Sequence, residues 1–120
     1  MKFIILIFVL FSAGHVFAKA ENILILGDSL SAGYGININE SWPALLQNKS
    51  SEESFNFKIH NASISGQTSA EGLAQISQLL KLSKPKLVIL ELGANDGLRG
   101  LSIQAMQQNL QSIISQSQLS

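Results

Sequence analysis

Three strand-like segments, each followed by a loop of small polar residues, constrain the fold of this 120-residue chain more than any other feature. The segments cover residues 23–26, 55–60 and 87–90. The first and the third are wholly apolar, so we expect both in the centre of a sheet. The second alternates apolar with polar residues, which indicates a half-buried strand at the sheet edge. Because helix-like segments separate the strands, the pattern predicts a parallel α/β sheet with right-handed crossovers.

Helix boundary signals stand in the intervening segments. Ser41 and Pro43 predict the start of one helix, with Ser41 as its N-cap. Thr68 and Glu71 form a capping box, which predicts the start of a second helix. Apolar residues at helical spacing predict a third helix over residues 102–117.

The N-terminal segment is predicted to be a signal peptide of residues 1–18. Lys2 precedes an apolar run over residues 3–11, and small residues up to Ala18 fit a cleavage site. The run is too short for a membrane span, so no stable membrane anchor is expected, although a retained anchor and cleavage after Ala20 stay open. We therefore expect an exported protein, periplasmic or secreted, whose residues 19–120 belong to one domain.

Composition excludes several classes of function. Without Lys2, seven basic residues stand against eight acidic ones, and no basic patch indicates a nucleic-acid partner. The chain has no cysteine, which excludes disulfides and thiolate metal sites. The sequence predicts no metal and no organic cofactor.

Chemistry-bearing residues follow the first strand-like segment directly. Gly27-Asp28-Ser29 predicts a sharp turn between a buried strand and a helix. A serine hydroxyl there can attack a carbonyl group, and helix N–H groups nearby can stabilise the oxyanion that forms. The alternative is an ordinary turn in which Asp28 or Ser29 is the helix N-cap.

The loops after the other two segments offer hydrogen-bond donors. Gly66 lies in the second loop, where a residue without Cβ exposes its N–H. Asn95 lies in the third loop, and its side-chain amide can donate to an oxyanion. Both also fit simple turns. Because the carboxyl ends of parallel strands meet at one edge, we expect Ser29, Gly66 and Asn95 to lie together, with Arg99 bracing the third loop.

His60 is the one histidine after the predicted signal peptide. It falls on the polar side of the second strand. We interpret it as a partly solvated strand residue that points away from the strand ends, and not as a catalytic base.

These loops together resemble the SGNH, or GDSL, hydrolase family, within it the exported bacterial thioesterase, lysophospholipase and arylesterase group. The matching blocks are Gly27-Asp28-Ser29-Leu30-Ser31, residues 61–68 and Gly93-Ala94-Asn95-Asp96. The resemblance implies a serine hydrolase that acts on small-molecule acyl esters or thioesters. It implies Ser29 as the nucleophile, and an oxyanion hole made by the N–H groups of Ser29 and Gly66 and by the Asn95 side chain. It also implies a flavodoxin-like three-layer α/β/α fold.

The resemblance implies two features that the sequence does not contain. The family carries a final Asp-x-x-His block, which supplies the general base and the residue that orients it, and no segment here matches it. The family sheet has five strands, so we expect a truncated domain with the first three of five βα units. The missing neighbour is expected to leave an unpaired apolar edge on the third strand.

Two alternatives stay open. The first is a catalytically incompetent truncated product that lacks its base. The second is a flavodoxin-like phosphate- or flavin-binding module, because residues 63–68 superficially resemble a phosphate loop.

Overall fold

The computed structural model describes residues 19–120, and the predicted signal peptide, residues 1–18, lies outside the described residues. Three parallel strands form one sheet in the order β2-β1-β3. They are β1 (Glu21–Gly27), β2 (Phe57–Asn61) and β3 (Leu87–Glu91). The prediction of a parallel α/β sheet is confirmed.

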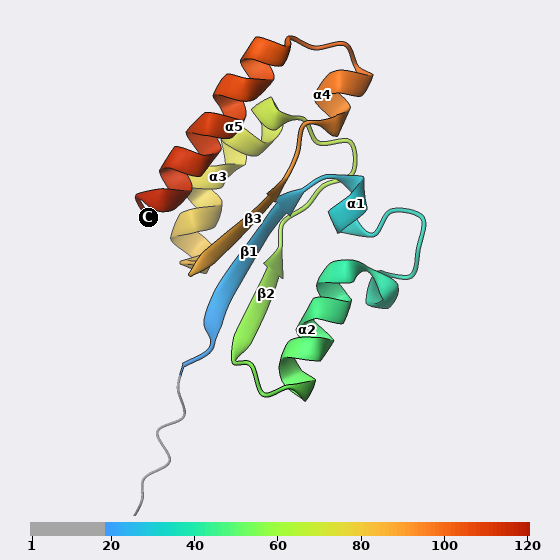
Figure 1. The fold of residues 1–120 in the computed structure, drawn as a ribbon, viewed down its shortest axis with the longest axis vertical. Coiled ribbons are helices and arrows are strands. Elements are labelled where there is room, and N and C mark those ends of the chain that lie inside the picture. Colours follow the sequence, from blue (N-terminus) through green and yellow to red (C-terminus); the bar gives the residue numbers. More distant parts are fainter. Residues whose placement is uncertain (1–18) are drawn as a thin grey trace, which may run out of the picture.

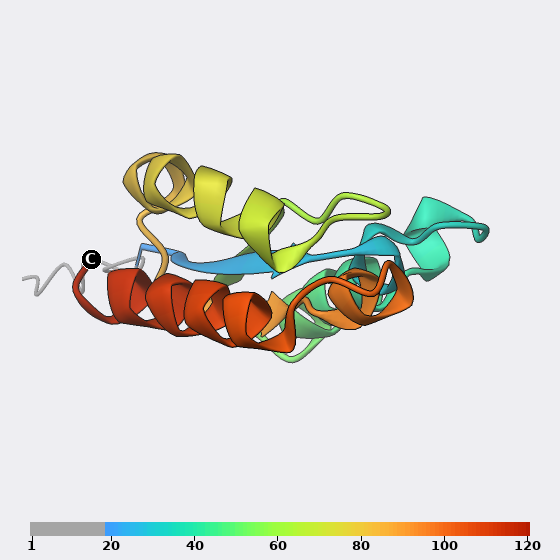
Figure 2. The same cartoon turned by 90° about the horizontal axis from the view of Figure 1, so that it is seen from above.

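One face of the sheet packs against two long helices, α3 (Ser69–Ser83) and α5 (Ile103–Gln118), which lie side by side (Figures 1 and 2). Alternate residues of β1 point into this layer because successive strand residues face opposite sides. The buried core there consists of Leu24, Leu26, Ile76, Leu80 and Ile113. This packing fixes the central strand, and with it the place where β1 ends.

Shorter elements lie on the other side of the sheet (Figure 1). They are α1 (Ser29–Ala32), the 3₁₀ helix η1 (Ile38–Glu40) and α2 (Trp42–Glu52). A further short helix, α4 (Ala94–Leu98), follows β3. The strands all point toward the edge where α1, α4 and the loop before α3 gather (Figure 1). The layers on both faces match the predicted three-layer arrangement.

The outer edge of β2 is covered by a side chain of α2. The Gln47 amide donates to the Phe57 carbonyl at 3.1 Å and accepts from the Ile59 N–H at 2.8 Å. An amide side chain thus takes the place of a neighbouring strand, which protects an edge that would otherwise offer free backbone groups. The prediction that this segment forms an edge strand is confirmed.

The prediction of a central position for the third strand is wrong for the part of the chain that the structure describes. β3 pairs with β1 alone among residues 19–120, and Leu87 is 52% exposed. The unpaired apolar edge expected from the family resemblance is what the described residues show. An apolar composition indicates that both faces of a strand are covered by other parts of the protein. It does not indicate whether a second strand pairs with its edge.

The capping signals predicted from the sequence are borne out at one helix start and only partly at another. The capping box of Thr68 and Glu71 is present in full at the start of α3. Ser41 occupies the N-cap position of α2, but its hydroxyl donates to the Ile38 carbonyl at 2.6 Å instead of capping the helix. The preceding η1, which the sequence analysis did not predict, brings that carbonyl within reach. None of the helices described over residues 19–120 is long and apolar enough to cross a bilayer.

Candidate active site

The turn at the end of β1 places Ser29 at the first position of α1. Asp28 is the N-cap, and its Oδ1 accepts from the Leu30 N–H at 3.0 Å. Ser29 is half-buried, and its N–H belongs to the first turn of α1, where N–H groups have no acceptor within the helix. Asp28 is therefore the N-cap of α1, and Ser29 follows it directly at the end of β1.

Glu91, at the end of β3, contacts this turn through its carboxylate. Its Oε2 accepts from the Ser31 hydroxyl at 2.8 Å and lies 3.3 Å from the Asp28 N–H. A Cβ on Gly27 would lie 2.8 Å from both Glu91 Oε2 and Ser31 Oγ, which is closer than real contacts allow. Gly27 is therefore required by the close approach of these two side chains. The sequence alone indicates no role for Glu91, although Glu91 ends an apolar strand in the way Gly27 does.

The second loop forms a tight turn around Gly66. The Gln67 N–H donates to the Ile64 carbonyl at 3.1 Å, and Gly66 has a φ of +81°, as the third residue of a type II turn requires. The Gly66 N–H takes no part in that turn bond. At the start of the loop, the Asn61 amide donates to the Ser31 carbonyl at 2.7 Å, which fastens the second loop to α1.

Asn95 joins the three loops. Its Nδ2 donates to the Gln67 carbonyl at 3.1 Å and lies 3.3 Å from Asp28 Oδ2. The first acceptor belongs to Gln67, which follows Gly66, and the second belongs to Asp28, which precedes Ser29. The structure therefore brings the loops that carry Ser29, Gly66 and Asn95 to one end of the sheet, as the sequence predicts.

Asp96 fixes the helix that carries Asn95. Its carboxylate is 3% exposed and accepts from the Ser69 N–H at 2.8 Å and from the Ser69 hydroxyl at 2.6 Å. The Asn109 amide of α5 donates to the same hydroxyl at 3.0 Å. A carboxylate at the start of α3 also stabilises that helix electrostatically. The sequence analysis missed this role, because the contact joins residues that are far apart in the chain.

Glu71, in the first turn of α3, has a lowered pKa. The Thr68 backbone N–H and then the Thr68 hydroxyl, at 2.7 and 2.9 Å from Glu71 Oε2, lower the pKa of the Glu71 carboxyl below its ordinary value of 4.5. The positive charge of Arg99 lowers this pKa further. Glu71 is therefore a carboxylate at neutral pH and stabilises the start of α3, next to Gly66.

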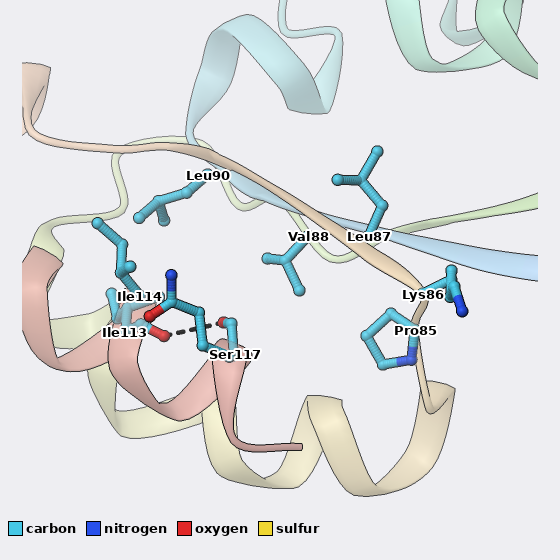
Figure 3. Close-up of a pocket in the computed structure, with 9 residues that line it drawn as sticks. Pro85, Lys86, Leu87, Val88, Leu90, Ile113, Ile114 and Ser117 are labelled. Atoms are coloured by element: carbon cyan, nitrogen blue, oxygen red, sulfur yellow. Dashed lines mark hydrogen bonds between the residues drawn. The ribbon is translucent and has the colours of Figure 1, made fainter.

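Among the hollows that the described residues line are one beside the loops of the candidate site and one away from them. One of about 200 Å³ lies beside the second loop, lined by residues 64–67 together with Glu71, Gln75 and Arg99. Another of about 270 Å³ lies between β3 and the end of α5, where Val88 and Leu90 face Ile113 and Ile114 (Figure 3). The second hollow also borders Pro85 and Lys86, which precede β3, so it lies away from the strand ends that carry the site.

His60 is placed far from Ser29. Its Nε2 lies 3.2 Å from Asn22 Oδ1, near the beginning of β1, whereas Ser29 follows the end of that strand. His60 pairs with Leu24, five residues before Ser29, which corresponds to about 16 Å along the strand. His60 is the one histidine among residues 19–120, so the prediction that it is no catalytic base agrees with its position. The same residues contain no group of three side chains suited to a metal ion.

Comparison with known proteins gives a consistent set of relatives. Residues 25–119 match the GDSL-like lipase/acylhydrolase family. The chain is 49% identical over 96 residues to esterase TesA of Pseudomonas aeruginosa PAO1, which covers 80% of this chain and 48% of that protein. It is 46% identical over 114 residues to thioesterase 1/protease 1/lysophospholipase L1 of Escherichia coli K12, which covers 95% of this chain and 51% of that protein.

Solved structures agree with these relatives. The psychrotrophic esterase EstA from Pseudoalteromonas sp., in a structure inhibited by monoethylphosphonate, has a TM-score of 0.79 and 47% sequence identity. The match covers 82% of this chain and 54% of that one. The chain thus spans about half the length of the curated and solved relatives that it matches.

Proposed function

The chain belongs to the GDSL-like lipase/acylhydrolase family, and we propose on this basis that Ser29 is the nucleophile of a serine hydrolase that cleaves carboxylic esters or thioesters. The observation that carries the proposal is the position of the Asn95 amide, which hydrogen-bonds to the neighbours of both Ser29 and Gly66. One nucleophile and three donors then share one end of the sheet.

The proposed reaction begins with attack of the Ser29 hydroxyl on the acyl carbonyl. The proton leaves to a general base, and the carbonyl oxygen becomes an oxyanion. The N–H groups of Ser29 and Gly66 and the Asn95 amide are the proposed donors to this oxyanion, because negative charge develops there in the transition state. The Asn95 amide has two hydrogens, so it would exchange its 3.3 Å contact with Asp28 Oδ2 for the oxyanion and keep its bond to the Gln67 carbonyl. Collapse of the intermediate expels an alcohol or thiol and leaves an acyl-serine, which water hydrolyses in a second step.

The general base is the part of the mechanism that residues 19–120 do not provide. His60 contacts Asn22 at the other end of β1. We propose that a histidine, oriented by an aspartate, reaches Ser29 from outside these 120 residues, as the family resemblance implies. Without such a base, loss of rate by several powers of ten is expected. The inactive product predicted as an alternative corresponds to that case.

The names of the relatives indicate the range of substrates. They include an esterase and an enzyme named as thioesterase, protease and lysophospholipase. For this chain we propose small-molecule acyl esters and thioesters, with no cofactor, in an exported protein.

Hydrolysis assays with the protein expressed from its own gene test the proposal. We expect turnover of a p-nitrophenyl ester and of an acyl thioester, and loss of both in Ser29→Ala. Ser77→Ala, an exposed serine of α3, is the matched control and should keep full activity. Equal activity in Ser29→Ala and the native protein would remove Ser29 from the mechanism.

A further inference from the structure

Arg99 contacts both loops that carry the proposed oxyanion donors. Its guanidinium Nη2 donates to the Gly66 carbonyl at 2.7 Å. Its backbone N–H donates to the Asn95 carbonyl at 3.0 Å, where Arg99 ends α4. One residue thus holds the second loop against the short helix that carries Asn95.

A hydrogen bond from Arg99 restricts the backbone strongly at Gly66. Gly66 is half-buried in a turn with a φ of +81°, and glycine rotates more freely than any other residue. The turn bond between Gln67 and Ile64 does not fix the direction of the Gly66 N–H by itself. The Gly66 carbonyl belongs to the same peptide unit as the Gln67 N–H, so Arg99 and the turn bond hold this unit from both ends. The direction of the adjoining Gly66 N–H then depends on the one remaining rotation, about the φ of Gly66.

Glu71 and the Gly66 turn both lie near the Arg99 guanidinium. The carboxylate of Glu71 is close enough for Arg99 to lower its pKa, and the attraction is mutual. A Cβ on Gly66 would lie 3.4 Å from Nη2, so the guanidinium rests directly on the turn. Arg99 is itself exposed, so its replacement removes the contact without opening the core.

We infer that Arg99 is a positioning residue of the oxyanion hole, which sets the direction of the Gly66 N–H relative to the Asn95 amide. This inference rests on the proposed function. As a positioning residue, Arg99 does not touch the reacting atoms. It acts through Gly66, and its effect is expected on the transition state and not on the binding of the substrate.

The test compares Arg99→Met and Arg99→Lys with the native protein, expressed from its own gene. Because a small misplacement of a catalytic group costs up to about 100-fold, we expect kcat to fall between about 10- and 100-fold in Arg99→Met with KM nearly unchanged. Arg99→Lys keeps a cationic donor and should lose less. Lys58→Met, which removes an exposed cation from β2, is the control and should keep native kcat.

A chemical rescue separates positioning from a merely structural role. Millimolar guanidinium should restore part of kcat in Arg99→Ala, because the free ion can occupy the vacated position beside Gly66. It should restore nothing in Lys58→Met or Asn95→Ala. Thermal unfolding of Arg99→Ala should stay close to that of the native protein.

The outcomes distinguish this inference from the proposed function. If the native protein loses its activity in Ser29→Ala but Arg99→Met retains native kcat, the inference alone is overturned. A rise in KM with unchanged kcat in Arg99→Met would also overturn it, because it would assign Arg99 to substrate binding. If the native protein has no Ser29-dependent activity, the proposed function fails and the inference fails with it.

Discussion

The Ser31 hydroxyl donates to the Glu91 carboxylate at 2.8 Å, and this contact joins the end of β3 to the turn that carries Ser29. The two side chains occupy the space into which a Cβ of Gly27 would project. The glycine that opens the Gly-Asp-Ser motif is thus explained by packing, whereas the serine is the proposed nucleophile.

Gly27→Ala is expected to destabilise the fold and to displace Ser29. The added methyl group would lie 2.8 Å from Glu91 Oε2, so Glu91 or Ser31 must shift and their bond must break. Breaking a partly buried, charged hydrogen bond costs about 1.5–3 kcal/mol. Urea unfolding measures this loss. Gly97→Ala, where nothing lies within 4 Å of a Cβ, is the control, and an equal loss in both variants would contradict the packing argument.

Gly66→Ala and Gly35→Ala form a matched pair. Both residues have a left-handed φ, +81° and +79°, so alanine is strained at either position by about 1–2 kcal/mol. Only Gly66 lies in the proposed oxyanion hole. We expect similar losses of unfolding free energy in the two variants and a loss of kcat in Gly66→Ala alone. Equal kcat values would show that the Gly66 turn has no part in catalysis.

Asn95→Ala is expected to lower kcat by about 100- to 1000-fold, because removal of one oxyanion donor has that effect in serine hydrolases. KM should change little. The variant also loses the bonds to Gln67 and Asp28, so thermal unfolding must be recorded beside the kinetics. Asn48→Ala, in an exposed position on α2, should match the native protein. An activity loss in Asn95→Ala that only parallels unfolding would argue against an oxyanion role.

Glu71 predicts a dependence of stability on pH. Its pKa is lowered in the folded chain, chiefly by the Thr68 backbone N–H, so its contribution is present above 4.5 and is lost as the pH falls through the folded pKa. Glu71→Gln should therefore be less stable than the native protein at neutral pH, and the difference should shrink below pH 4.5. Urea unfolding across that range measures both. A difference that stays constant with pH would contradict the assignment.

Local patterns predicted most of the elements. The apolar run of residues 23–26 predicts a buried central strand, because a strand covered on both faces has no polar side, and β1 takes that place. The capping box of Thr68 and Glu71 needs only neighbours in sequence, so it appears as predicted. Both signals are local and suffice without tertiary contacts.

The features that the sequence did not predict depend on partners far along the chain. Glu91 and Asp96 acquire their roles from contacts 60 and 27 residues away. Serine is a residue type that caps helices, yet the Ser41 hydroxyl donates to the Ile38 carbonyl instead. The place of β3 depends on which strands are present beside it. A short segment shows the local preference of a residue. It does not show the distant partner that can override that preference.

The most direct test of the account is labelling with a fluorophosphonate, followed by mass spectrometry of the peptide that contains Ser29. We expect one covalent adduct per chain, on Ser29, with labelling abolished in Ser29→Ala and unchanged in Ser77→Ala. An adduct on another residue, or labelling of Ser29→Ala at the native rate, would contradict the central claim that Ser29 is the nucleophile.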